Sequence, residues 1–335
     1  QSTGAFSLGN GTASPTLNLG GNLSIVTSGT FTYTGSGTGA VNFTKSGTQT
    51  LTNAGTMAGL INYNVNNGST LDVGTNLISG TGTFTVASGG GLITANTAGI
   101  ASSGATGSIR NTGTRTFNTG ANYTFNASSA QSTGTGFTGA NNLTINNSAG
   151  VSLSAAAAVT GTLTLTSGKL TLGANNLTLT GATVSGGGSS NYFVTDGAGK
   201  IVRSITSGGG SFGFPIGRSS STYNPVTITN TGGATSIYTV GVATTSYSPG
   251  ADGANAQWSI ASGTSTTSTF AFTWTTADAG ANLTASPASG NVYSYNGSSW
   301  GTTGGTTSAG SPNVTTQSGI TSANTIWTVA MPAAV

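Results

Sequence analysis

The sequence predicts an all-β protein, in which a parallel β-helix (solenoid) is followed by an antiparallel β-sandwich domain. Three observations lead to this prediction. Apolar residues alternate with Thr, Ser or Asn over short runs, which places the apolar side chains on one face of a half-buried strand. Gly, Ser and Asn separate the runs, as tight corners with unusual backbone angles require. The composition also changes near Gly186, beyond which all four Trp residues lie.

The segment 161–186 has the clearest alternation. It contains three L-T-L runs, and Leu163, Leu170, Leu177 and Val184 recur every seven residues. A seven-residue apolar spacing also occurs in coiled coils, but here the local period is two and turn-forming residues fill the gaps. The segment therefore predicts successive short strands joined by tight corners.

Similar short runs continue through residues 21–188, which are predicted to form the solenoid. The sequence ANNLT at 140–144 returns at 174–178, 34 residues later, and such repetition predicts stacked coils. Short strands with short corners favour a β-helix over the alternative, a Gly-rich β-sandwich. The alternating runs in this region are Leu23–Ile25, Phe31–Tyr33, Val41–Phe43, Ile61–Val65, Leu71–Val73, Phe84–Val86, Tyr123–Phe125, Leu143–Ile145 and Val151–Leu153.

The two flanking segments differ from the repeats. Residues 1–20 are polar and Gly-rich, and are predicted either to cap the first coil or to donate a strand to a neighbouring molecule. Residues 189–335 have longer apolar runs, with Trp258, Trp274, Trp300 and Trp327 spread between turn signals. This pattern predicts the core of a conventional antiparallel sandwich.

The composition excludes several classes of function. Only 3% of the residues are charged, and the chain has no Glu, His or Cys. Ser–His–Asp and Cys–His catalysis, disulfides and a typical zinc site are therefore ruled out. The few cations do not cluster as phosphate binding requires, and no apolar run is long enough for a membrane helix. We expect no enzymatic activity, cofactor, nucleic-acid partner or membrane insertion. The remaining enzyme alternative is a β-helical polysaccharide lyase with Lys or Arg as its base.

Several side chains are candidates for binding. Asp196 and Asp252 each precede Gly and suit a weak calcium site, although an Asp-Gly turn is the favoured interpretation. Lys200, Arg203 and Arg218 are candidate contacts for an anion or sugar acid near the domain junction. The alternative for these cations is stem packing and hydrogen bonds to loop carbonyls.

Aromatic and Thr residues suggest two further kinds of site. Tyr293, Tyr295 and Trp300 are candidate stacking partners for sugars, with an aromatic core as the alternative. Ice binding needs a flat, regular lattice of Thr over many coils, whereas Thr also suits any exposed strand position. The Thr residues that prompt this hypothesis are Thr162, Thr164, Thr171, Thr178 and Thr180.

Motifs in the second half of the chain resemble a known module. They are YFVTDGAGKIVR at 192–203, GFPIG at 213–217, YNPVTI at 223–228 and YNGSSW at 295–300. Together they resemble a module of large secreted surface proteins of the Bacteroidota, the cargo of the type IX secretion system. The resemblance covers residues 145–335 and implies an extracellular location at the bacterial cell surface with a structural or adhesive role. It implies no catalytic residues.

The leading functional hypothesis is a self-assembling subunit of a cell-surface fibre, sheath or layer. A solenoid ends in an unpaired coil that recruits another chain unless it is capped. Low charge removes long-range repulsion, so copies would join head-to-tail into a homopolymer. The alternative is a monomeric adhesin or carbohydrate-binding protein with cell-surface glycans as partners, followed by an ice-binding solenoid.

Overall fold

The chain folds into two compact units. The computed structural model describes residues 4–244, 252–264, 266–295, 297–321 and 324–332. Unit 1 contains residues 1–170 and 182–186, and unit 2 contains residues 171–181 and 187–335. The predicted all-β class and the predicted solenoid are confirmed, because the chain forms a parallel β-solenoid of about ten turns.

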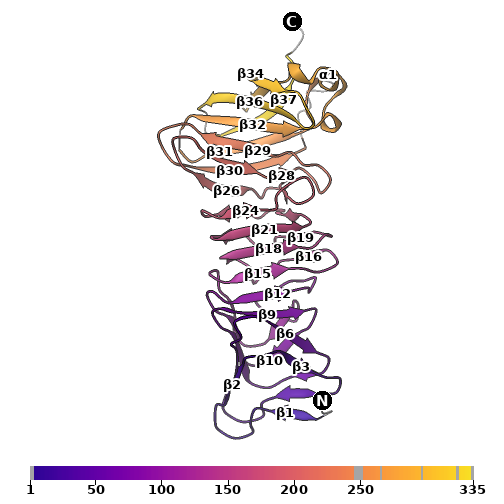
Figure 1. Ribbon diagram of the computed structural model, residues 1–335, viewed down its shortest axis with the longest axis vertical. Coiled ribbons are helices and arrows are strands. Elements are labelled where there is room, and N and C mark those ends of the chain that lie inside the picture. The colour runs from indigo at the N-terminus through magenta and orange to yellow at the C-terminus, as the bar shows by residue number, and fades with distance from the viewer. Residues whose placement is uncertain (1–3, 245–251, 265, 296, 322–323, 333–335) are drawn as a thin grey trace. The chain divides into compact units, whose positions relative to one another are not determined.

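The largest sheet of unit 1 has eight strands stacked in parallel, one from each successive coil (Figure 1). Period-two alternation places every second residue of these strands inside the coil. Their order along the stack is β3 (Leu23–Ile25), β6 (Gly47–Asn53), β9 (Ser69–Gly74), β12 (Gly91–Thr94), β15 (Asn122–Phe125), β18 (Asn142–Asn146), β21 (Thr162–Ser167) and β24 (Thr183–Ser185).

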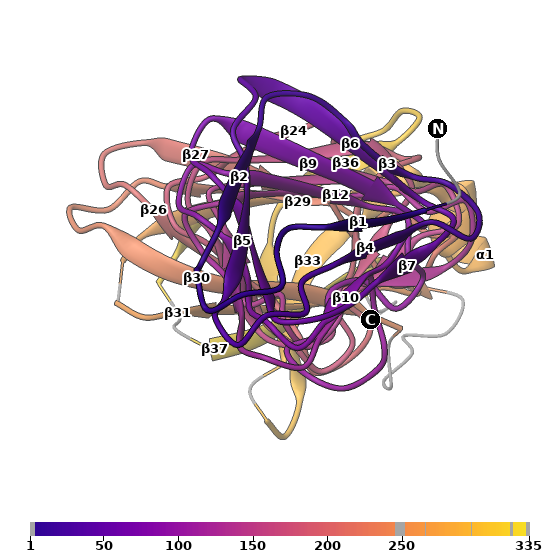
Figure 2. The same cartoon turned by 90° about the horizontal axis from the view of Figure 1, so that it is seen from below.

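Smaller parallel sheets form the other sides of unit 1, and Figure 2 shows β1, β2 and β3 on different sides of its interior. One has five strands: β2 (Thr16–Leu19), β5 (Gly39–Phe43), β8 (Ile61–Val65), β11 (Phe84–Val86) and β14 (Arg115–Phe117). Another has β1 (Ala5–Ser7), β4 (Thr30–Thr32) and β7 (Thr56–Met57). The remaining pairs are β10 (Ile78–Gly80) with β13 (Ile109–Asn111), β16 (Gln131–Ser132) with β19 (Val151–Ser152), and β17 (Gly139–Ala140) with β20 (Ala157–Val159).

The core of unit 1 is built from columns of side chains in register. Leu143 of β18 pairs with Leu163 of β21, 20 residues on, and both are fully buried. On the outer face, Asn64 donates to Asn42 over 2.9 Å, and Asn42 donates to Asn18 over 2.8 Å, at separations of 22 and 24 residues. These separations mean that the 34-residue spacing of the ANNLT copies is not the coil spacing.

The predicted short strands of segment 161–186 are confirmed. They are β21, β22 (Leu170–Thr171), β23 (Leu177–Leu179) and β24. Leu163, Leu170 and Leu177 are fully buried, and Val184 is half-buried. Period two was therefore the correct interpretation of the alternation.

Two buried glutamines join coils at corresponding corners. Gln49 donates from Nε2 to the carbonyl oxygens of Leu19 and Gly21 at 3.3 and 2.6 Å, and its Oε1 accepts from Ser69 Oγ at 3.0 Å. Gln131 makes the equivalent pair of bonds to Thr94 and Asn96, both at 2.9 Å. Each amide satisfies backbone carbonyls that would otherwise be buried without a partner.

Unit 2 changes from parallel to antiparallel pairing. β26 (Ile201–Ile205) is parallel to β23 on one side and antiparallel to β30 (Ser236–Ala243) on the other. The sheet continues with β31 (Gln257–Ser262), β37 (Asn324–Ala330), β33 (Asn291–Tyr295) and β34 (Trp300–Gly304). A second, antiparallel sheet has β27 (Gly210–Phe214), β29 (Val226–Asn230), β32 (Ser268–Trp274), β36 (Asn313–Ile320) and β35 (Thr306–Ser308).

Buried aromatic side chains join these two sheets. The ring centroids of Trp258 in β31 and Phe272 in β32 are 5.0 Å apart, and those of Phe270 and Trp327 are 5.4 Å apart. Tyr238 Oη lies 2.7 Å from Ser268 Oγ across the same interface. The mixed and antiparallel sheets of unit 2 are therefore sandwich-like. The other elements of unit 2 are the parallel pair β25 (Phe193–Val194) and β28 (Ile216–Gly217), and the short helices η2 (Thr276–Asp278), α1 (Ala281–Ala285) and η3 (Pro287–Ser289).

Candidate functional site

The first coil of the solenoid has open strand edges on three sides. Within the described part of the chain, β1, β2 and β3 each end their sheets, and pair with β4, β5 and β6 on one side only. Two parts of the predicted N-terminal segment, residues 5–7 and 16–19, thus form strands that pair within this chain. Residues 1–3 of that segment lie outside the described part. An open edge presents N–H and C=O groups that can pair with another strand.

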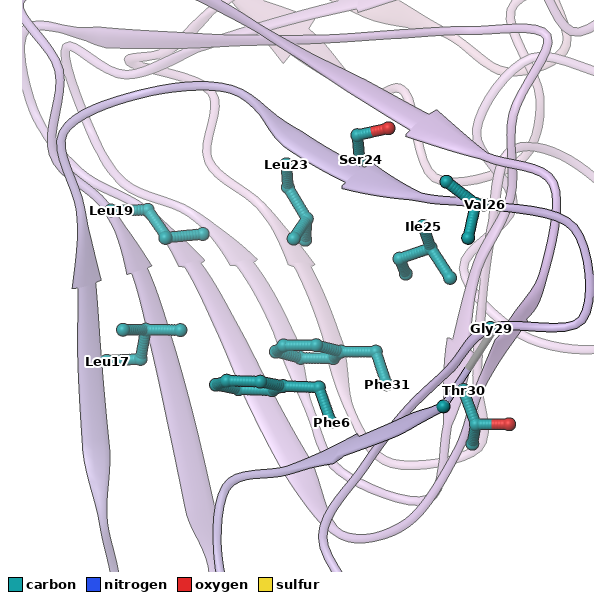
Figure 3. Close-up of a pocket in the computed structure, with 11 residues that line it drawn as sticks. Phe6, Leu17, Leu19, Leu23, Ser24, Ile25, Val26, Gly29, Thr30 and Phe31 are labelled. Atoms are coloured by element: carbon teal, nitrogen blue, oxygen red, sulfur yellow. The ribbon is translucent and has the colours of Figure 1, made fainter. Parts of the chain in front are cut away.

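An apolar cavity of about 620 Å³ lies between these edge strands. Figure 3 shows Leu17 and Leu19 from β2, Leu23 and Ile25 from β3, and the stacked rings of Phe6 and Phe31 pointing into it. The two rings are 5.5 Å apart with an angle of 4° between their planes.

Among the described residues, the strands around the cavity have a strand neighbour on one side only, and their apolar side chains are unevenly buried. Leu19 pairs in register with Phe43, which is fully buried, yet Leu19 itself is only half-buried. Phe6 pairs with Phe31, and their side chains are 54% and 4% exposed. Residues 4–44 contain no charged side chain, and none of the residues that line the cavity is charged.

The three cations predicted to contact an anion have separate partners in unit 2. Lys200 Nζ donates to the carbonyl oxygen of Gly197 at 2.8 Å, and its stem packs against Gly241, where an added Cβ would clash with Lys200 Cδ. Burial lowers the pKa of the Lys200 ammonium, and the charge of Asp196 opposes this effect. The guanidinium of Arg203 lies 3.9 Å from the centre of the Phe212 ring, and burial lowers its pKa.

Arg218 belongs to a buried polar network around Asp278. Its Nη2 lies 2.7 Å from Asp278 Oδ1, and the Asp278 side chain is 6% exposed. Asp278 Oδ2 accepts from Asn224 Nδ2 at 3.0 Å and from Thr275 Oγ1 at 3.1 Å. Sequence reasoning did not identify Asp278 as a site residue, because its partner Arg218 is 60 residues away.

Two of the predicted aromatic residues are brought together. Tyr295 and Trp300 are register partners in the hairpin β33–β34, and their ring centroids are 5.3 Å apart. Tyr293 precedes Tyr295 by two positions, so both share one strand face, and its Oη donates to the carbonyl oxygen of Met331 at 3.0 Å. All three side chains are partly exposed.

The Thr candidates do not form one row. Thr164 aligns with Thr144 and Thr124 on successive strands of the eight-stranded sheet, but Ile93 precedes them and Ser185 follows. Thr162 also lies in β21, whereas Thr171 and Thr178 lie in β22 and β23, outside this sheet.

The structure gives the two Asp-Gly motifs different surroundings. Asp252 Oδ1 accepts from Asn282 Nδ2 at 2.7 Å, and Asp196 is exposed near Lys200. Within the described ranges, no group of three His, Cys, Asp or Glu residues could hold a metal ion. No helix of the described part combines the length and apolar character needed to span a bilayer.

Comparison with known proteins does not extend these observations. A scan against family models found no match, and neither curated proteins nor solved structures gave one.

Proposed function

We propose that this chain is a non-enzymatic extracellular structural protein, a self-assembling subunit of a cell-surface fibre, sheath or layer. The observation that carries the proposal is the combination of three open strand edges and an apolar cavity at the first coil. A second copy that docks there would satisfy the backbone groups of the edges and bury the exposed Phe6 ring.

The absence of charge supports a protein partner at this end. Exposed edge strands are usually protected by charged side chains, bulges or a covering segment. Residues 4–44 contain no charged side chain, so two copies would meet here without repulsion between like charges.

Unit 2 offers a surface for a head-to-tail contact. β34 ends its sheet and is largely exposed, so its free edge could accept β1, β2 or β3 of the next copy. A contact between two different surfaces does not close on itself and produces an open polymer. A contact between two first coils would instead stop at a dimer.

We also infer that unit 2 is a β-sandwich domain and that the protein is exported. The aromatic contacts between its two sheets support the first inference. The chain's low charge and the motifs at 192–203 and 213–217 that resemble type IX secretion cargo support the second.

Substitution of Phe6 and Leu17 by Lys tests the assembly surface. Two ammonium groups at the cavity would have to lose water when a second copy docks, which is costly without partners. We expect sedimentation velocity and negative-stain microscopy to show fibres or sheets for the native chain and monomers for the double variant, with the thermal midpoint retained. Phe6→Lys alone, at a side chain that is 54% exposed, covers the case in which the double variant does not fold.

Two further variants define the contact. Ile237→Lys is the matched control, because Ile237 is 53% exposed on β30 in unit 2, and it should assemble like the native chain. Thr302→Lys places a charge on β34, the unit 2 side of the head-to-tail contact, and should prevent polymers from forming. Only a contact between two first coils would remain, so the variant should form at most dimers. A native chain that stays monomeric at every concentration would refute the proposal, as would normal assembly of the Phe6 and Leu17 variants or of Thr302→Lys.

A second candidate function is an adhesin or carbohydrate-binding module. The partly exposed pair of Tyr295 and Trp300 favours it, because sugars stack on such rings. This candidate predicts saccharide binding that is lost in Trp300→Ala.

A further inference from the structure

A second cavity, of about 480 Å³, lies within unit 2, and most of the residues that line it carry a hydroxyl or carboxylate group, unlike the mainly aliphatic and Phe lining at the first coil. Its lining includes the half-buried Tyr223, Thr273 and Thr275 and the buried Asp278. Exposed residues, among them Ser311 and Pro312, contribute the rim. Small-molecule sites typically occupy about 300–1,000 Å³, so this cavity is large enough for a sugar ring.

The carboxylate of Asp278 is fixed in place and retains capacity to accept a hydrogen bond. Arg218 occupies Oδ1 at 2.7 Å, while Asn224 and Thr275 occupy Oδ2. An ionised carboxylate offers about four acceptor positions, so one position on Oδ1 is left for a donor from a ligand.

Several hydroxyl groups around the cavity also have capacity to spare. The side chains of Tyr223, Thr273 and Ser311 form no hydrogen bond with another described residue. Tyr223 is held in position by Tyr192, whose ring centroid lies 5.2 Å away at an angle of 42°. Burial raises the pKa of Tyr223, so its hydroxyl remains a neutral donor and acceptor at neutral pH.

The charges of the cavity select for an uncharged ligand. Arg218 neutralises Asp278 directly, so neither a cation nor an anion gains a net electrostatic partner. The hydroxyls suit a ligand with several O–H groups, and the Tyr223 ring and Pro312 offer apolar surface to its C–H groups.

We propose that this cavity is a binding site for a neutral saccharide. In it, Asp278 Oδ1 accepts a hydrogen bond from a sugar hydroxyl, and Tyr223, Thr273 and Ser311 bond to its neighbours. The site is separate from the open edges of the first coil and does not depend on assembly. It is also separate from the Tyr295–Trp300 pair, which does not line the cavity.

Titration of the full chain with a sugar panel, followed by NMR or calorimetry, tests the site. The probes are glucose, galactose, mannose and N-acetylglucosamine, with glucuronic acid and glucosamine as charged comparators. We expect saturable binding of at least one neutral sugar with a Kd on the order of 1 mM. Tyr223→Phe and Thr273→Val should each weaken binding about fivefold, the usual loss for one neutral hydrogen bond.

Matched variants separate this cavity from other surfaces. Thr227→Val is the control for Thr273→Val, because Thr227 is exposed on β29 of the same sheet and does not line the cavity. Ser311→Ala, at an exposed rim position, covers a failure of the other variants to fold. The proposal is overturned if no neutral sugar binds, if charged sugars bind equally well, or if binding is lost only in Trp300→Ala.

Discussion

The first coil and the inner coils of the solenoid share one sequence pattern but differ in burial. Leu17 and Leu19 alternate with polar residues just as Val41 and Phe43 do one coil further on. Val41 and Phe43 are fully buried, whereas Leu17 and Leu19 are half-buried and line a cavity. Alternation therefore makes a strand inward-facing, but only neighbours on both sides complete its core.

This difference follows from the way solenoids are stabilised. The stability of a repeat array is approximately a sum of terms for each repeat and for each contact with a neighbour. Among the described residues the first coil has a neighbouring coil on one side only, so its apolar residues contribute less in the isolated chain than the same residue types further along.

Phe43→Ala should have the largest effect on the free energy of unfolding. Truncating a buried Phe removes its transfer energy and leaves a cavity, which together cost about 3–5 kcal/mol. Leu19→Ala at the paired position of the first coil should cost no more than about 1 kcal/mol, since the side chain is half-buried. Urea unfolding of both variants, at concentrations where the chain is monomeric, measures the difference.

The same pair of variants also reports on assembly. If the first coil docks a second copy, Leu19 becomes buried there, and the cost of Leu19→Ala should rise with protein concentration. Equal costs for the two variants in the monomer would contradict the difference drawn between the coils.

Replacement of the buried glutamines should have the next largest effect. Gln131→Leu leaves the carbonyl oxygens of Thr94 and Asn96 without their amide donor inside the solenoid, at a cost of about 2–3 kcal/mol. Gln49→Leu should cost about 1 kcal/mol, because its acceptors Leu19 and Gly21 belong to the first coil, where water reaches them.

Thermal unfolding of the two Leu variants against the native chain checks this order. Gln131→Glu is a useful third variant, since it keeps the shape but removes the donor. A Gln49 variant as unstable as the Gln131 variant would mean that the first coil is as well shielded from water as the inner ones.

The strands could be predicted from the sequence because their pattern is local. Alternation over a few residues identified β21 to β24 and their buried Leu residues correctly. The coil spacing could not be predicted, because register is set by pairing between distant strands and by corner length. Phe84, for example, pairs with Arg115, 31 residues on, whereas Tyr63 pairs with Phe84 after 21.

The candidate sites also divide into those formed by residues close in the sequence, which could be predicted, and those formed by distant residues, which could not. Tyr295 and Trp300 are five residues apart around a turn, so their approach could be expected. Lys200 donates a hydrogen bond to the carbonyl oxygen of Gly197, three residues away. This matches the alternative prediction for the cations, hydrogen bonding to loop carbonyls. The pairing of Arg218 with Asp278 and the cavity of the first coil depend on residues far apart in the chain, for which sequence pattern has no signal.

Replacing Tyr63 by Phe should have the smallest effect on the free energy of unfolding at neutral pH, and a larger effect at alkaline pH. The Tyr63 hydroxyl is buried and has no hydrogen-bond partner among the described residues. By contrast, the hydroxyl of Tyr33, which is closer to the first coil, lies 2.9 Å from the carbonyl oxygen of Gly11 and 2.5 Å from that of Ala13. Tyr63→Phe should therefore be neutral or stabilise the chain by up to about 1 kcal/mol at pH 7.

Burial raises the pKa of Tyr63 well above its usual value of 10.0. Above that value the unfolded chain loses the phenol proton while the folded chain keeps it, so the free energy of unfolding falls as the pH rises. The loss amounts to about 1.4 kcal/mol per pH unit for each such group. Denaturant unfolding between pH 9 and pH 12 should show a shallower decline for Tyr63→Phe than for the native chain. Parallel curves for the two would mean that water reaches the Tyr63 hydroxyl, and that the inner coils are no drier than the first.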